Sequence, residues 1–288
     1  MRKLAIVGMM AALAGCKGGG EGTVALAAWG EEAPYDGFPN AELSFVDGWA
    51  LSFNHSITAF GNVELADPST EEVVASDANL YVADFVKTTD PAAVSEITVA
   101  EGRYKFSFDT VAATAEATAI SDVNADALGE MIANGWSTYI DGQATKGDVT
   151  VTFKWGMPSP THYRFCLNGE DDTDGIAVSA GESTDATMFF HQDHTYWDRL
   201  GTEEANLRFD APAAWADENG EIHLDDLADA PLAPLEDASG EAILDANGDP
   251  LSYDDAGLGL QNLKAYILYT SAQFAHMNGG GECAVVSP

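Results

Sequence analysis

Tyr104-Lys105-Phe106-Ser107-Phe108 is the stretch that decides the fold, because it carries an aromatic ring at every second position. Successive side chains of an extended chain point to opposite faces, so the three rings share one face. This alternation is typical of a β-strand with one face buried. The residues around it therefore belong to a sheet that lies on a hydrophobic core.

Short alternating segments, separated by turn residues, continue on both sides of this stretch. They cover residues 43–46, 49–53, 57–65, 80–85, 97–108, 137–144, 149–155, 162–167, 175–178 and 184–190. The turn Lys146-Gly147-Asp148 predicts a hairpin, and residues 125–134 predict one short helix that ends before Gly135. Because helices that could connect parallel strands are missing, the pattern favours an antiparallel β-sandwich over an α/β sheet.

Beyond about Tyr196 the spacing of apolar residues changes from the period of a strand to that of a helix. Residues 202–209, 211–216, 224–230 and 257–276 have apolar side chains at helical spacing. We therefore predict a mainly β protein, with an antiparallel β-sandwich over residues 41–195 and a helical C-terminal portion over 196–288.

The first residues have the layout of a secretory signal: Arg2 and Lys3, then the apolar run 4–13, then small residues. Leu13-Ala14-Gly15-Cys16 resembles the lipobox of bacterial lipoproteins, with a chance cysteine after an ordinary signal as the alternative. The resemblance implies a signal peptide over 1–15, a lipid on Cys16 and a flexible leash over 16–40. Several acyl chains hold a protein on a membrane lastingly. Lys17 stands where inner-membrane retention signals have Asp, so the resemblance implies the cell envelope, with the outer membrane favoured over the inner.

The chain is strongly acidic, with 12 basic and 47 acidic residues and a formal charge of -35. Removing Arg2 and Lys3 with the signal leaves a charge of -37. Such a surface repels nucleic acid and anionic lipid headgroups. Such a surface also attracts cations, although solubility or adaptation to a saline habitat is the preferred explanation of the acidity. Since 46% of the residues are hydrophobic, the chain can also bury a substantial core.

Three cysteines are present, and lipid on Cys16 would leave Cys166 and Cys283 as a pair. Exported proteins meet an oxidising compartment, so the pair predicts a disulfide. A bridge closing so long a loop contributes on the order of 4 kcal/mol in the chain-entropy model. Metal ligation by the thiolates is the weaker alternative because neither cysteine has CxxC spacing.

The stretch from Trp215 to Asp226 resembles a degenerate EF-hand calcium loop, with Gly220 at the position of the sharp turn. The candidate Ca²⁺ ligands are Asp217, Asn219, the Glu221 carbonyl and Asp226. Two departures weaken the match: Trp215 replaces the first ligand, and Asp226 is shorter than the bidentate Glu that calcium prefers. A loop that has lost its calcium is the alternative.

A second candidate site follows the strand that ends at Phe190. Its possible ligands for copper or zinc are His191, Asp193 and His194, with His276 added if the disulfide brings the chain end back. If the turn is helical, the i,i+3 spacing places His191 and His194 on one face. Local hydrogen bonding at the sheet edge is the alternative, and His55 and His162 are expected to be structural.

Motifs of catalytic nucleophiles, zinc proteases, phosphate loops and dinucleotide folds do not occur, so we predict no enzymatic activity. The His191-Gln-Asp193-His194 run is similar to the end of the metallo-β-lactamase signature, but Phe189 replaces its first histidine. The motif order is also similar to uncharacterised envelope lipoproteins, which implies no activity.

We expect a non-catalytic envelope lipoprotein that binds Ca²⁺. The alternatives are a copper or zinc lipoprotein and glycan binding or adhesion through exposed aromatics. Those aromatics are Trp136, Trp155, Trp197 and Trp215.

Overall fold

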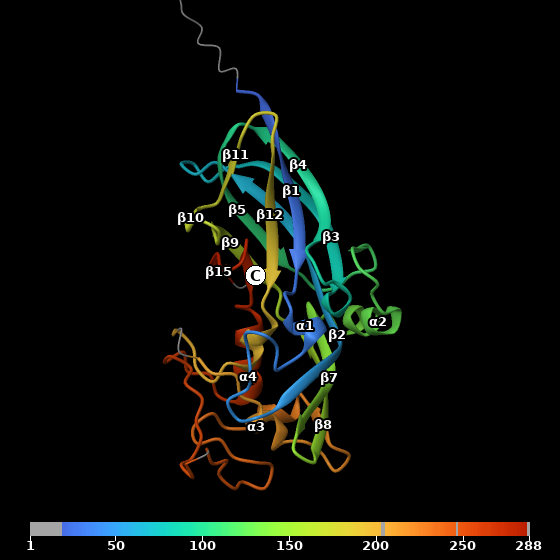
Figure 1. Ribbon diagram of the computed structural model, residues 1–288, viewed down its shortest axis with the longest axis vertical. Coiled ribbons are helices and arrows are strands. Elements are labelled where there is room, and N and C mark those ends of the chain that lie inside the picture. The colour runs from blue at the N-terminus through green and yellow to red at the C-terminus, as the bar shows by residue number, and fades with distance from the viewer. Residues whose placement is uncertain (1–18, 203–204, 246, 287–288) are drawn as a thin grey trace, which may run out of the picture.

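The smaller of two β-sheets has four strands, with a strand from the N-terminal region inside it. The computed structural model describes residues 19–202, 205–245 and 247–286. The strand order is β14 (Ala275–Met277), β12 (Ser183–Phe190), β1 (Glu21–Trp29) and β4 (Ala92–Ala100). β1 pairs in parallel with β12 and antiparallel with β4, while β14 pairs antiparallel with β12 (Figure 1).

The larger sheet has eleven strands, and the long strand β2 runs through its middle. Its main order is β10 (Thr173–Asp174), β9 (Thr161–Asn168), β5 (Gly102–Thr110), β2 (Ala50–Ala66), β7 (Thr138–Lys146), β8 (Val149–Met157) and β13 (Glu221–His223). Further strands are β3 (Val73–Asp84), β6 (Thr118–Ala119), β11 (Ile176–Val178) and β15 (Ala284–Val286). One end of β2 pairs with β7 and the other with β3 and β5, so this strand links two parts of the molecule.

The first hydrophobic core joins the two sheets. Phe106 and Phe108 of β5 are fully buried in it, together with Val24 and Leu26 of β1. The predicted strand with its aromatic face in the core is therefore confirmed, but Ser107 on its other face is buried as well, so this part of the strand is not half-buried. The fold is mainly β and sandwich-like, as predicted, although its pairing is mixed rather than purely antiparallel.

A second core lies where the C-terminal region covers β7, β8 and the first half of β2. It contains Trp155 of β8, Tyr196, Phe209 and Tyr266. Since its members come from both sides of residue 195, the predicted domain boundary does not correspond to a break in the packing.

Helices are short and few. They are α1 (Ala33–Asp36), α2 (Ala125–Asn134), α3 (Asp210–Ala213) and α4 (Leu263–Ser271), with 3-10 turns η1 (Phe85–Lys87), η2 (Gln192–Tyr196) and η3 (Asp226–Ala228). The prediction of α2 is confirmed: the Asn124 side chain caps it by accepting from the backbone of Asp126 and Ala127, and Gly135 ends it in a left-handed conformation. Among the described residues, no helix has the length and apolar character needed to cross a membrane.

The C-terminal portion is less helical than the sequence predicts. The helix expected over 202–209 is wrong, because the backbone of Asn206 and Arg208 pairs with Asp198 and Tyr196. The buried Asp198 carboxylate also accepts hydrogen bonds from both of these residues, through the Asn206 backbone and the Arg208 side chain. The helix expected over 257–276 is reduced to α4. Tertiary pairing overrides the local periodicity here.

The leash predicted over 16–40 is too long, since β1 begins at Glu21. Val24, Leu26 and Ala28 alternate toward the core, but small residues between glycines concealed this pattern in the sequence. Cys16 and the predicted signal peptide lie outside the described residues, so lipidation stays a prediction.

The predicted disulfide is confirmed: Cys166 and Cys283 are joined with an S–S distance of 2.04 Å and a sequence separation of 117 residues. Cys166 belongs to β9, and Cys283 directly precedes β15, which pairs with β9. The bridge therefore fastens the C-terminal segment to the larger sheet.

Replacing both cysteines, Cys166→Ala and Cys283→Ala, should lower the free energy of unfolding by about 4 kcal/mol, because the unfolded chain regains the freedom of a long loop. Urea denaturation of the double variant measures this loss. A matched pair of surface changes, Ser69→Ala and Ser239→Ala, serves as the control. A double variant as stable as the native chain would contradict a structural role for the bridge.

Candidate metal centre

The end of β12, the turn η2 and the strand β14 bring three histidines together. His191 follows the last residue of β12, and its backbone N–H donates to the Phe274 carbonyl at 2.7 Å. His194 lies in η2, and His276 lies in β14 opposite Phe189. Antiparallel pairing of β12 with β14 thus places residues 85 positions apart beside each other. We call His191, His194 and His276, with Asp193, the histidine cluster.

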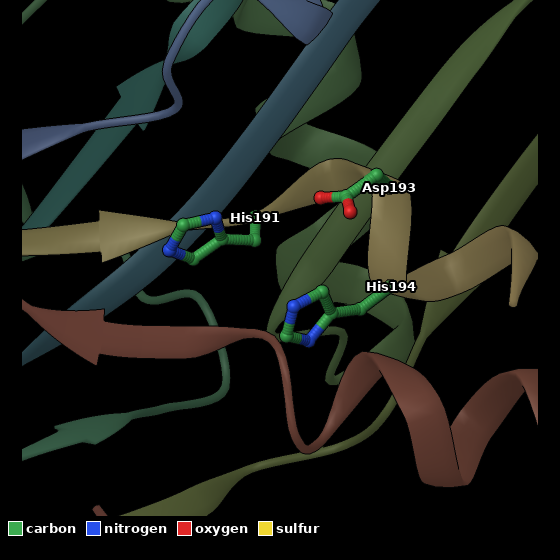
Figure 2. A group of neighbouring side chains, drawn as sticks. All are labelled: His191, Asp193 and His194. Carbon is green, nitrogen blue, oxygen red and sulfur yellow. The ribbon is translucent and has the colours of Figure 1, made fainter. Parts of the chain in front are cut away.

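The imidazole rings of the cluster touch one another. Ring centroids are 5.3 Å apart for His191 and His194, 4.8 Å for His191 and His276, and 5.2 Å for His194 and His276. One ligand atom from each of His191, Asp193 and His194 lies within 4.8 Å of the others. Figure 2 shows these three side chains around the turn η2, with His194 directed toward the segment that connects α4 to β14.

These distances suit a transition-metal ion after a small contraction. Nitrogens bound to one tetrahedral ion at about 2.0–2.1 Å lie about 3.3 Å apart. The ligand atoms of His191, Asp193 and His194 therefore need to move together by on the order of 1 Å, which side-chain torsions can supply.

His194 has the state that a metal ligand requires. Its Nδ1 is 3.1 Å from the carbonyl oxygen of Gln273, which can only accept a hydrogen bond, so Nδ1 carries the proton. Burial, and then the neighbouring His191 and His276, hold the pKa of His194 well below its usual value. The ring is neutral and Nε2 retains its lone pair. A backbone carbonyl that fixes the tautomer in this way is the usual outer partner of a metal-bound histidine.

His276 is a half-buried residue whose two ring nitrogens are inaccessible. Neither nitrogen has a partner of good hydrogen-bond geometry among the described residues, but the backbone of Gly280 and Gln273 lies close enough to interact with the ring and to oppose the lowering of its pKa. Burial, and then the charge of His191, lower the pKa of His276 to about 4, so it is neutral. An unpaired buried polar group costs about 1–3 kcal/mol, which a bound ion would offset.

His191 differs from His194 and His276 because its pKa is raised and not lowered. Its Nδ1 is 3.0 Å from the Glu31 carboxylate, and its Nε2 is 3.3 Å from the Gly279 carbonyl. Burial alone would lower the pKa of His191, but the hydrogen bond and charge of Glu31 outweigh it and raise the pKa. The ring is an imidazolium that donates from both nitrogens. A metal ion would replace one of these protons.

Asp193 and Trp197 complete the surroundings. Burial raises the pKa of Asp193, against the opposing charge of His191 and a hydrogen bond from the Trp197 side chain. The Trp197 ring lies against His194, with centroids 3.7 Å apart. The indole therefore orients a candidate carboxylate ligand and a candidate imidazole ligand together.

The calcium candidates are arranged differently. Asp217 accepts hydrogen bonds from the backbone of Asn219 and Glu221, which closes a tight turn before β13. Asp226 begins η3. Among the described residues, the carboxylates of Asp217, Glu221 and Asp226 do not form a group of three within 4.8 Å, and the Glu221 carbonyl accepts a hydrogen bond from the Asp217 backbone at 2.8 Å. Calcium binding at this loop stays a prediction without added support.

His55, His162 and the tryptophans considered for glycan binding have structural partners. His55 pairs with Asp84 at 2.7 Å and His162 with Asp109 at 2.8 Å, as expected. Trp155 is fully buried, and the Trp215 indole donates to the Glu236 carbonyl. Trp136 stacks on Tyr139. With Trp155 in the core and Trp197 beside His194, the four tryptophans do not share one exposed surface.

Sequence reasoning missed Glu31, Gln273 and Gly279, which hold the histidines in place. Glu31 is separated from His191 by 160 residues and has a left-handed backbone with φ of 59°. No local pattern marks such a residue, because only the parallel pairing of β1 with β12 brings it to the site.

Comparison with protein-family models, curated proteins and solved structures finds no match for this chain. The function is therefore inferred from the site itself.

Changing Glu31→Gln should lower the pKa of His191, because the charge that offsets burial is removed while burial remains. Histidine side-chain resonances followed by NMR during a pH titration measure this pKa. The neighbouring change Glu32→Gln is the control and should leave His191 unaltered. An unchanged His191 pKa in the Glu31→Gln variant would show that the ion pair does not form.

Proposed function

We propose that this protein is a non-catalytic, metal-binding lipoprotein of the cell envelope that binds Cu²⁺ or Zn²⁺ through His191, His194 and His276. The single observation that carries the proposal is the convergence of three imidazole rings, His191, His194 and His276, whose centroids lie 4.8–5.3 Å apart. Neutral imidazole is a preferred ligand of copper and zinc.

The charges around the cluster also support a divalent cation. Glu31 and Asp193 place two carboxyl groups beside a single imidazolium. No lysine or arginine forms an ion pair with either carboxyl group in the described chain. A divalent ion that displaces the His191 proton would therefore balance the carboxylates. The formal charge of -35 raises the concentration of cations near the surface as well.

Copper is favoured over zinc among these metals. For a given set of nitrogen and oxygen ligands, affinity for divalent first-row ions peaks at Cu²⁺. Calcium prefers six to eight oxygen ligands, so a cluster dominated by imidazole excludes it as the main occupant. The envelope location depends on the lipobox around Cys16, whose lipid would keep the site on a membrane surface.

Replacing one ligand, His194→Gln or His276→Gln, should weaken Cu²⁺ binding by more than about 100-fold, since even outer partners of metal ligands contribute 10–100-fold. Competition titration of the purified full chain with a chromophoric chelator measures the affinity. His55→Gln and His162→Gln are matched controls outside the cluster and should bind copper normally. Equal affinity in all four variants would rule out the histidine cluster as the site.

Metal should also stabilise the fold. An ion present at 100 times its dissociation constant adds about 2.7 kcal/mol to the free energy of unfolding. In a chain of this size the melting temperature should rise by roughly 5 °C or more, and a chelator should reverse the change. Differential scanning calorimetry with Cu²⁺ or Zn²⁺ measures it.

A His194→Gln/His276→Gln double variant is the control for this experiment, and its melting temperature should not respond to either metal. If millimolar Ca²⁺ instead stabilised the native chain and the double variant equally, calcium at another site, such as the Asp217 loop, would explain the stabilisation.

A further inference from the structure

A pocket of about 820 Å³ lies directly beside the histidine cluster. His194 and His276 form part of its wall, whereas His191 and Asp193 do not. The cluster thus has two sides: Glu31, Asp193 and His191 lie away from the pocket wall, and two neutral imidazoles border the pocket. An ion bound at His194 would therefore lie beside the wall of the pocket.

The volume of the pocket exceeds what an ion and its water need. Pockets for organic ligands span about 300–1,000 Å³, while one water occupies about 30 Å³ of liquid. The pocket is therefore large enough for an organic molecule that would reach the metal with one atom.

The residues that line the pocket determine which chemical class of molecule it can bind. Most are apolar or aromatic, including Leu200, Leu258, Trp197 and Tyr269, and Glu282 is the only acidic residue in the described lining. No lysine or arginine occurs among these described residues. An anionic ligand would therefore lack a countercharge and would meet the negative field of the whole chain.

Resting on the metal binding proposed above, we propose that the pocket binds a neutral or cationic aromatic nitrogen heterocycle with an apolar body, whose nitrogen completes the coordination of the ion at His194 and His276. Copper and zinc favour imidazole-type nitrogen as a neutral donor. Trp197 and Tyr269 contribute aromatic rings to the lining of the pocket. Leu200 and Leu258 contribute apolar surface that the apolar body of the ligand would contact.

The test uses the full chain loaded with Cu²⁺ and three probes: 4-phenylimidazole, imidazole and 4-(imidazol-4-yl)benzoate. Isothermal titration calorimetry gives each affinity, and electron paramagnetic resonance shows whether a further nitrogen binds the copper. We expect 4-phenylimidazole to bind at least tenfold more tightly than imidazole, because its phenyl ring enters the pocket. The benzoate should bind at least tenfold more weakly than 4-phenylimidazole, and metal-free protein should bind 4-phenylimidazole at least tenfold more weakly than the copper form.

A matched pair of leucines locates the binding. Leu258 lines the pocket and is 51% exposed, and Leu244 is 52% exposed and is not part of the lining. Leu258→Asp should weaken 4-phenylimidazole at least fivefold and leave imidazole unchanged, while Leu244→Asp should affect neither probe. Both side chains are on the surface, so both variants are expected to fold.

The outcomes separate the two proposals. If copper loads at the histidines but 4-phenylimidazole and imidazole bind equally, if neither binds, or if Leu258→Asp has no effect, the pocket is not a ligand site and the metal proposal stands. The same holds if the benzoate binds as tightly as 4-phenylimidazole, or if metal-free protein binds the probe equally well. If copper fails to load, the proposed function and this inference are both wrong.

Discussion

The packing of Phe190 is the contact on which the rest of the site depends. Its buried ring lies 5.2 Å from Phe60 of β2 and 5.6 Å from Phe274, measured between centroids. Phe190 precedes His191, and Phe274 precedes β14, which carries His276. The ring therefore joins both sheets and both backbone segments of the cluster in one rigid core. Side chains at the ends of such elements are held more precisely than side chains on free loops, as a metal centre requires.

Burial and charge act on the three imidazoles in different ways, although the rings are in contact. Desolvation lowers the pKa of each ring, but Glu31 reverses the effect at His191 alone. The positive charge that results on His191 then lowers the pKa values of His194 and His276 further. One carboxylate thus favours a single positive charge in the cluster, on His191, and leaves two rings neutral. A divalent ion that displaced one proton of His191 would add one further positive charge, which the Asp193 carboxyl group beside Glu31 can balance.

Some of this arrangement could be predicted from the sequence, and the reasons are physical. Alternating aromatics gave the strand at Phe106, and the glycine at position 135 gave the end of α2, because both signals are local. The disulfide followed from the number of cysteines and the expected compartment. It also led to the grouping of His276 with His191 and His194, which the pairing of β14 with β12 supports. By contrast, β1 and Glu31 were missed because their roles depend on parallel pairing with a strand far along the chain, and parallel pairing leaves no turn in the sequence.

The unpaired ring of His276 is the part of the site that the fold alone does not explain. His55 and His162 show that this chain pairs its structural histidines with carboxylates, Asp84 and Asp109. His276 has no such partner, and a buried imidazole without one destabilises the folded state. The segment that carries it is nevertheless held by the β12 pairing on one side and by the Cys283 disulfide on the other. An imidazole without a side-chain partner, in a segment fixed on both sides, has the position that a preorganised ligand needs, and an ion bound as proposed would supply such a partner.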